Sequence, residues 1–261
     1  MSAVVLKDGL VHYEAIGRGT GPLVFVHGWL GSWRYWVPAM EELSIARRTY
    51  AFDLWGFGDS ERHRDYSVRT YVELLQAFLD EMGIRRVALV GHSLGGLIAL
   101  RFAAQWPSRV ERVMGVSVPL FGSSVEPLFS IFSGNGNALT RLIARQANFP
   151  EVEREARKAD LEAITASLRS AMERDLSEMT VPAYVPVLLV HGEDDLLVQV
   201  PRPGWLRRVA ENARIVRLTG VHHFPMLEEK NKFNRLLKEF LRRDGDLDSL
   251  QLKEEWRRRL R

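Results

Sequence analysis

Short apolar runs alternate with longer amphipathic segments along most of the 261-residue chain. The runs are rich in β-branched residues and bounded by glycine, proline or polar residues, which predicts strands covered on both faces. These runs are Leu23–His27, Thr49–Asp53, Val87–Gly91, Val110–Val116, Val187–His191 and Ala213–Leu218. Apolar residues at three- and four-residue spacing predict helices over Ser67–Met82, Leu94–Trp106 and Asn231–Arg243. Such alternation is typical of an α/β fold with a mostly parallel central sheet and helices on both faces.

The segment from about Pro119 to Pro182 interrupts the alternation because it contains no run that would form a strand. Its first part, Pro119–Phe149, is apolar and irregular, whereas Glu151–Met179 is charged and has the pattern of a helix. The residues on the apolar face of that helix are Leu161, Ile164, Leu168 and Met172. We therefore predict a small helical cap inserted between two strands of the sheet.

These patterns divide the chain into a core, a cap and a tail. Residues 1–118 and 183–243 form the predicted α/β core, residues 119–182 the cap, and residues 244–261 a charged C-terminal tail. Apolar residues recur every fourth position in the tail, which predicts an extra helix packed on the body or on a second subunit. The alternatives are a solvated end, or a basic end that contacts an anionic surface.

Composition excludes several classes of protein. The chain has no cysteine, which excludes a disulfide scaffold, a thiolate metal site and a cysteine nucleophile. Its 36 basic and 33 acidic residues leave a net charge of +3, which gives no electrostatic reason to expect a nucleic acid partner. No apolar stretch approaches the length of a transmembrane segment, and the N-terminus does not resemble a secretory signal. We therefore expect a cytoplasmic protein.

The strongest chemical signal is the hexapeptide Gly91-His92-Ser93-Leu94-Gly95-Gly96. It follows one predicted strand and opens a predicted helix, which is the context of a nucleophile elbow. Small glycines would allow a sharp turn that exposes the Ser93 oxygen near backbone N–H groups. The alternative is a glycine-rich turn with a passive serine.

A serine hydroxyl needs a base to accept its proton, and the base needs a carboxylate to orient it. Both follow later in the chain, in loops after predicted strands, where open α/β sheets place their sites. The loop after Val187–His191 offers Asp194 and Asp195, and the loop after Ala213–Leu218 offers His222 and His223. From the residues alone, either member of each pair is a candidate.

These motifs, in this order, resemble the α/β-hydrolase fold superfamily, in its serine-nucleophile branch of haloperoxidase-like and carboxylesterase-like enzymes. The resemblance covers about Gly9 to Arg243. It implies that Ser93 is the nucleophile, that Asp195 is the acid because Gly192-x-x-Asp195 has the family spacing, and that His223 is the base because Gly220-x-x-His223 has it.

Two further motifs extend the resemblance. His27-Gly28-Trp29 is similar to the family's oxyanion loop, which implies an oxyanion hole formed by the backbone N–H groups of Trp29 and Leu94. The segment Asp53–Ser60 matches the family's D-x-x-G-x-G-x-S loop, which is structural. A glycine-dense segment, Gly17–Gly21, precedes a strand instead of opening a helix, so we expect a hairpin turn there and not a phosphate site.

The function implied is a serine hydrolase that cleaves carboxylic esters of small to medium, mostly apolar acyl groups. Serine at position 93, in place of aspartate, argues against the dehalogenase and epoxide hydrolase branches. The expected pocket is apolar, and its candidate residues are Leu30, Phe121, Phe129, Phe132 and Val198. No metal or nucleotide motif is present, so we expect no cofactor. The expected partner is a small-molecule ester, and the expected assembly a monomer or homodimer.

Two alternatives remain. One is a carbon–carbon bond hydrolase of dienoate type, although position 92 is histidine where those enzymes more often have asparagine, and Phe224 stands where they usually have tryptophan. The other is a ligand-binding receptor on the same fold that turns its ligand over slowly.

Overall fold

The structure, a computed structural model, describes residues 2–7, 9–120, 149–173, 180–201, 203–242 and 247–251. Within these ranges eight strands form one sheet, in the spatial order β1, β2, β4, β3, β5, β6, β7, β8. The strands are β1 (Ser2–Leu6), β2 (Gly9–Ile16), β3 (Gly21–Val26), β4 (Arg47–Phe52), β5 (Val87–His92), β6 (Val110–Val116), β7 (Val187–Gly192) and β8 (Arg214–Leu218). The pairs β1–β2 and β2–β4 are antiparallel, and all other neighbours are parallel.

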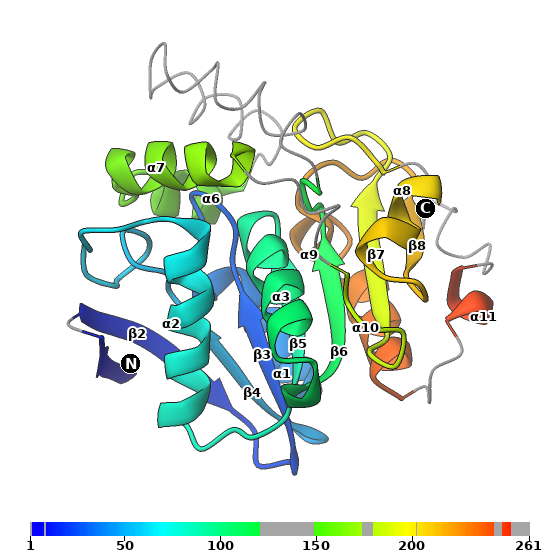
Figure 1. The fold of residues 1–261 in the computed structure, drawn as a ribbon, viewed down its shortest axis with the longest axis horizontal. Helices are drawn as coiled ribbons and strands as arrows, with labels where there is room; N and C mark the ends of the chain where they lie inside the picture. The colour runs from blue at the N-terminus through cyan, green and yellow to red at the C-terminus, as the bar shows by residue number, and fades with distance from the viewer. Residues whose placement is uncertain are drawn as a thin grey trace.

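Helices cover both faces of the sheet (Figure 1). One face carries α2 (Val68–Glu81), α3 (Leu94–Gln105) and α8 (Pro203–Val209), and the other carries α1 (Val37–Leu43) and α10 (Lys230–Arg242). Every residue of β5 and β7 is buried as a result, which is why the runs Val87–Val90 and Val187–Val190 are apolar. The predicted α/β fold with a mostly parallel sheet is confirmed.

The ends of α2 illustrate how local sequence sets the elements. The Ser67 hydroxyl accepts the Thr70 backbone N–H at the start of the helix, satisfying a donor that has no partner within the helix. At the other end, Gly83 has a φ of +67°, a left-handed conformation that glycine adopts without strain. These signals lie within a few residues of each helix end, so the sequence pattern locates α2 closely.

The six predicted strands correspond to β3–β8, but the sequence pattern does not predict β1 and β2. Strand β1 lies at the edge of the sheet, and its short apolar run Ala3–Leu6 is mostly exposed, unlike the strands that the pattern predicts. The hairpin expected at Gly17–Gly21 is wrong, because β4 lies between β2 and β3. Strand β3 pairs with the parallel strands β4 and β5, and its four last residues are buried. The apolar strand β3 is thus buried at the centre of the sheet, and β4 separates it from β2.

The cap is described in part. Helices α6 (Pro150–Ala156) and α7 (Leu161–Met172) lie over the carboxyl ends of the strands (Figure 1). Ile164 and Leu168 of α7 are buried as expected, but Leu161 is 59% exposed, because it opens the helix beyond the edge of the packed face. Residues 121–148 and 174–179 lie outside the described residues, so the cap boundaries stay predictions.

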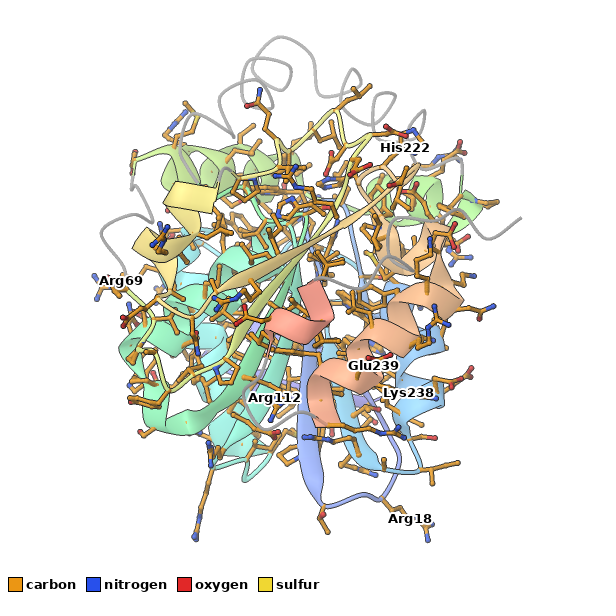
Figure 2. The ribbon with its side chains drawn as sticks, turned by 90° about the vertical axis from the view of Figure 1, so that its right-hand side faces the viewer. Arg18, Arg69, Arg112, His222, Lys238 and Glu239 are labelled. Carbon is orange, nitrogen blue, oxygen red and sulfur yellow. The ribbon has the colours of Figure 1, made fainter. Side chains whose placement is uncertain are left out.

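Loops at the cap end of the sheet carry the candidate chemistry. His222, which follows β8, lies at this end, whereas Arg18, which precedes β3, lies at the opposite end (Figure 2). The remaining helices of the described residues are short: η1 (Trp33–Trp36), η2 (Pro107–Arg109), α9 (Pro225–Glu228) and α11 (Asp248–Gln251). No helix in the described ranges has both the length and the apolar composition needed to cross a bilayer.

The tail begins as a short helix against the body. Leu247 and Leu250, at and within α11, are buried, and the Arg214 guanidinium of β8 donates a hydrogen bond to the Asp248 carboxylate. Residues 252–261 lie outside the described residues, so the apolar stripe expected there stays a prediction.

Candidate active site

Ser93 lies in the turn between β5 and α3, with φ +50° and ψ −113°. A positive φ is strained for a residue with a side chain and persists only where its surroundings impose it. A Cβ on Gly91 would lie 2.2 Å from the Gly95 carbonyl oxygen, and a Cβ on Gly95 would lie 2.2 Å from the Val26 carbonyl oxygen. The sharp turn therefore requires glycine at both positions. The Ser93 side chain is buried, and its Oγ has no hydrogen-bond partner among the described residues.

Asp195 and His223 are paired. Nδ1 of His223 lies 2.9 Å from Oδ2 of Asp195, and Oδ1 accepts the backbone N–H groups of Leu197 (2.8 Å) and Val198 (3.0 Å). Burial alone would raise the pKa of Asp195, but the imidazole and these N–H groups outweigh it and lower the pKa to about 2. An ionised carboxylate only accepts hydrogen bonds, so the proton is on Nδ1. In the neutral ring, Nε2 is then the atom that can take a proton.

The neighbouring candidates have different surroundings. Asp194 is exposed, and its backbone N–H donates to the Val221 carbonyl oxygen (3.0 Å). His222 is partly exposed, and its Nδ1 lies 3.0 Å from the Glu228 carboxylate. Of the two pairs left open by the residues alone, the structure thus brings together Asp195 and His223.

His92 connects the turn of Ser93 to the loop of His223. Its Nε2 donates to the backbone carbonyl oxygen of His223 (2.9 Å), and the two rings meet edge to face with centroids 4.8 Å apart. Burial lowers the pKa of His92 well below its usual range, so the ring is neutral. Because a carbonyl oxygen only accepts, the single ring proton must be on Nε2. The residue before Ser93 therefore fixes the backbone of the histidine loop.

The loop after β3 packs directly against Ser93. A Cβ on Gly28 would lie 2.7 Å from the Ser93 Cβ, so only glycine allows this approach. His27 holds the loop in place: its Nδ1 donates to the Gly28 carbonyl oxygen (2.8 Å), and its Nε2 accepts the Leu54 N–H (2.9 Å). Burial lowers the pKa of His27 to about 4, so it is neutral. The backbone N–H groups of Trp29 and Leu94 donate to no residue in the described ranges.

A sequence model described as the alpha/beta hydrolase fold matches residues 21–161, more than half of the chain. The chain belongs to the α/β-hydrolase fold family. It is 27% identical to a 2-hydroxy-6-oxo-2,4-heptadienoate hydrolase of Pseudomonas putida, over 91% of this chain and 95% of that protein. It is also 27% identical to a pimeloyl-[acyl-carrier protein] methyl ester esterase of Nitrosomonas europaea, over 85% of this chain and 96% of that protein.

Solved structures agree on the fold. The crystal structure of an enol-lactonase from Burkholderia xenovorans superimposes with a TM-score of 0.81, covering 93% of this chain and all of that one, at 21% sequence identity. At this identity the likeness concerns the fold alone. The curated relatives are an esterase and a carbon–carbon hydrolase, so this α/β-hydrolase has relatives in both classes considered from its sequence.

Glu228 is a residue of this α/β-hydrolase that the sequence reasoning missed. Its carboxylate accepts the backbone N–H of His222 (2.8 Å) and the backbone N–H of Phe224 (2.9 Å). It therefore holds the chain on both sides of His223 while leaving the imidazole free to contact Asp195. The only signal in the sequence is a carboxylate within the short helix that begins directly after the loop.

Two of the five predicted pocket residues fall in the described ranges. Leu30 is buried in a strained conformation with φ +61°, and its carbonyl oxygen accepts the Tyr35 hydroxyl (3.0 Å). Val198 is buried beside the acid, where its N–H contacts Asp195. Phe121, Phe129 and Phe132 lie outside the described residues, so their part in a pocket stays a prediction.

One group of possible metal ligands occurs in the described ranges: His12, Asp53 and Asp59. Both oxygens of Asp59 are already engaged, by Lys158 (2.8 Å) and by Arg34 (2.8 Å). Both oxygens of Asp53 accept backbone N–H groups, from Trp33 (2.7 Å) and Asp59 (2.8 Å). With two cations against this cluster, the donor set fits an ion-pair network and not a metal centre.

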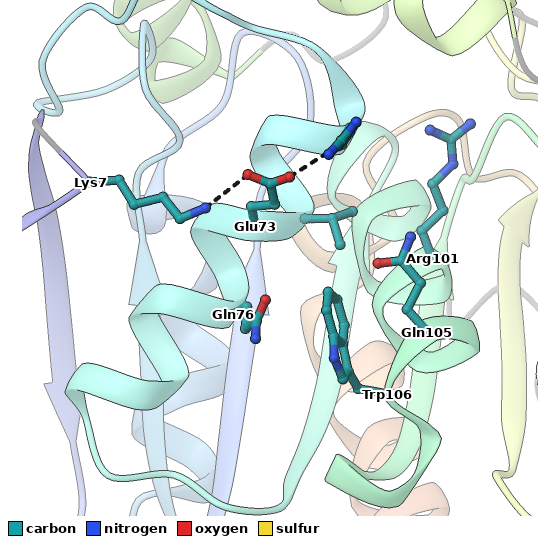
Figure 3. A pocket seen from close by; sticks show the side chains of 8 residues that line it. Lys7, Glu73, Gln76, Arg101, Gln105 and Trp106 are labelled. Atoms are coloured by element: carbon teal, nitrogen blue, oxygen red, sulfur yellow. Dashed lines mark hydrogen bonds and ion pairs between the residues drawn. The ribbon is translucent and has the colours of Figure 1, made fainter.

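A separate cavity of about 480 Å³ lies between α2 and α3 (Figure 3). Its charged lining includes Glu73, whose carboxylate contacts Lys7 (2.8 Å) and Arg69 (3.1 Å). None of the residues predicted for the active site lines it. This cavity is therefore separate from the candidate catalytic residues, which lie in the loops at the cap end of the sheet.

Proposed function

We propose that this protein is a carboxylesterase, which cleaves esters of small to medium, mostly apolar acyl groups through an acyl-enzyme. The observation that carries the proposal is the His223–Asp195 hydrogen bond, together with a strained, buried serine whose turn is tied to the His223 loop through His92. A nucleophile, a base with a fixed tautomer and an orienting carboxylate are the groups that acyl transfer needs. The methyl ester esterase among the relatives supports the same reaction class.

In the proposed mechanism, Ser93 Oγ attacks the ester carbonyl carbon while His223 Nε2 takes the hydroxyl proton. Asp195 stabilises the resulting imidazolium and keeps Nδ1 protonated. The oxyanion that forms accepts the N–H groups of Trp29 and Leu94. Collapse of the intermediate expels the alcohol, which receives the proton from His223. Water then attacks the acyl-enzyme with His223 again as base, releasing the carboxylic acid and free Ser93.

Carbon–carbon bond hydrolysis is the second candidate function. It is supported by the 2-hydroxy-6-oxo-2,4-heptadienoate hydrolase, which matches nearly the whole chain. The two candidates use the same kind of serine and histidine, so they differ in substrate. Comparing the turnover of an aromatic or aliphatic dienoate with that of an ester series distinguishes the two candidate functions.

The experiment that tests the proposal is labelling with a fluorophosphonate probe, together with p-nitrophenyl esters from acetate to decanoate. We expect stoichiometric labelling at Ser93 and turnover that depends on chain length. Ser93→Ala should abolish labelling and lower turnover by at least about a thousandfold. Ser117→Ala is the matched control, because Ser117 is also buried with a positive φ of +47° and an unpartnered hydroxyl in the described ranges, but it follows β6 and does not lie in the glycine turn that opens α3.

The outcomes separate the candidates. Labelling without ester turnover, but with cleavage of a dienoate, favours the carbon–carbon hydrolase. Labelling with saturable ligand binding and negligible turnover of either substrate favours a slow receptor. No labelling of the wild-type protein overturns the proposed nucleophile.

A further inference from the structure

The cap contacts the proposed oxyanion loop through one buried hydrogen bond. The Trp29 indole Nε1–H donates to the Ser167 hydroxyl at 2.8 Å, joining residues 138 positions apart in the chain. Trp29 lies in the loop against Ser93, and Ser167 lies on α7 of the cap. Both side chains are buried, Ser167 completely. A hydrogen bond between buried groups has no competition from water, and loss of one partner leaves the other unsatisfied.

The Ser167 hydroxyl is oriented to accept this bond. As a donor it is directed to the Ala163 carbonyl oxygen, one turn earlier in α7. Its lone pairs are therefore left for the indole, which can only donate. Because the hydroxyl donates one hydrogen bond and accepts the other, its rotation is fixed, and the indole is held in one position.

The helix that carries Ser167 is itself fixed to the core. The Asp160 backbone N–H donates to the Gly56 carbonyl oxygen (2.8 Å), and the Tyr66 hydroxyl donates to the Asp160 carboxylate (3.1 Å). Further along α7, the Ser170 hydroxyl accepts the Val68 backbone N–H (3.1 Å). Attached to the core at several points, α7 does not depend on any single one of these bonds to support the indole.

The other bonds of the loop hold the residues around Trp29 and not Trp29 itself. The Gly28 carbonyl oxygen accepts from His27 and from the Gly31 N–H (3.1 Å), and the Leu30 carbonyl oxygen accepts from Tyr35. Leu30 is strained at φ +61°, so the backbone that follows Trp29 keeps this conformation only because its surroundings impose it. With the indole fixed, rotation about the backbone bonds of Trp29 is restricted, and so is the direction of the Trp29 N–H.

We propose that Ser167 is a positioning residue for the oxyanion hole, which acts by holding the Trp29 indole and thereby aiming the Trp29 backbone N–H. This rests on the proposed function, in which that N–H donates a hydrogen bond to the oxyanion. A donor aimed at the oxyanion contributes in the transition state and not in substrate binding. Loss of Ser167 should therefore lower kcat and leave KM nearly unchanged.

The test compares four variants with p-nitrophenyl esters. Ser167→Ala should lower kcat by about tenfold with KM within about twofold, a fraction of the loss when an oxyanion donor is removed outright. Ser167→Thr retains the hydroxyl and should recover most of kcat. Trp29→Phe removes the donor from the other side and should have a similar effect, and Trp29→Phe/Ser167→Ala should be no slower than Trp29→Phe alone.

Ser170→Ala is the matched control. It removes a hydrogen bond between the same cap helix and the core, but one that does not involve the oxyanion loop. We expect its kcat to remain within about twofold of the wild type. A loss in Ser170→Ala equal to that in Ser167→Ala would overturn the proposal, because the effect would then be general loosening of α7. Multiplicative losses in the double variant would overturn it as well.

Failure of the inference is distinguishable from failure of the proposed function. If the wild-type protein neither binds the fluorophosphonate covalently nor turns over esters, the proposed function fails. If the wild type does both and Ser167→Ala does so equally fast, only the role of Ser167 fails.

Discussion

Around Ser93, single atoms decide which residue can occupy a position. Gly28 does not have a left-handed φ, so its backbone would accept any residue, yet an added Cβ would lie 2.7 Å from the Ser93 Cβ and 2.8 Å from His92 Nδ1. Gly91 and Gly95 are excluded from bearing side chains by backbone oxygens. These three positions therefore require glycine because neighbouring atoms leave no space for a Cβ, and not because the backbone adopts a conformation that only glycine allows.

Gly28→Ala should consequently lower esterase turnover by about a hundredfold or more, because the loop must move away from Ser93 by a fraction of an ångström or more. The measurement is kcat/KM with a p-nitrophenyl ester. Gly204→Ala in α8 is the control, since a Cβ there meets nothing within 4 Å. That change should leave turnover unaltered and stabilise the protein by up to about 1 kcal/mol. Equal turnover in both variants would contradict the crowding argument.

At the scale of elements, the described cap helices are attached to the core by charge as well as by apolar contact. Glu155 of α6 is completely buried, and its carboxylate lies 3.6 Å from Arg34, 3.1 Å from Arg154 and 3.2 Å from Lys158. Arg34 and Lys158 also contact Asp59, in the loop after β4. The network thus joins the cap to the segment that follows the oxyanion loop.

Glu155→Gln should destabilise the protein by about 2 kcal/mol, because it removes a buried carboxylate that pairs with three cationic side chains. The loss is smaller than for a fully buried pair, since Arg34 and Lys158 keep part of their hydration. Urea unfolding measures it. Glu153→Gln on the same helix is the control, because Glu153 is exposed and 3.9 Å from Arg157, and should change stability by less than about 0.5 kcal/mol. Indistinguishable midpoints for the two variants would show that the network contributes nothing.

At the scale of the whole molecule, buried histidines link stability to pH. Burial lowers the pKa of His27 and of His191 to about 4, lowers that of His92 well below its usual range, and lowers that of His12. Between these values and the usual 6.5, the unfolded chain binds protons that the folded chain does not. Burial also raises the pKa of Asp53 to about 7, so below pH 7 the folded chain keeps a proton on this carboxyl that the unfolded chain has lost. This proton offsets one of the four that the histidines bind only in the unfolded chain.

Stability should therefore fall as pH decreases from about 6.5 to about 4, with a slope of up to about 4 kcal/mol per pH unit for three net protons. Urea midpoints between pH 4.5 and 8 measure the slope. His191→Leu should reduce it by the equivalent of one proton, since neither ring nitrogen of His191 has a hydrogen-bond partner in the described ranges. An unchanged slope in this variant would contradict the assignment of His191 as a neutral buried group.

The sequence alone was sufficient for features encoded within a few residues. The apolar runs predicted β3–β8 because a strand covered on both faces must be apolar throughout. The glycines around Ser93 indicated a sharp turn because the steric limits act between immediate neighbours. The edge strand β1 carries the short apolar run Ala3–Leu6, but this run is mostly exposed, so a pattern based on strands covered on both faces missed it.

Tertiary structure decided what depends on residues far apart in the chain. It inserted β4 between β2 and β3, brought Asp195 and not Asp194 to His223, and placed Ser167 against Trp29. It also buried Glu155, although the helix around it is charged along its sequence. Local periodicity cannot encode these contacts, because each depends on which faces of distant elements exclude water together, and that is settled only when the whole core packs.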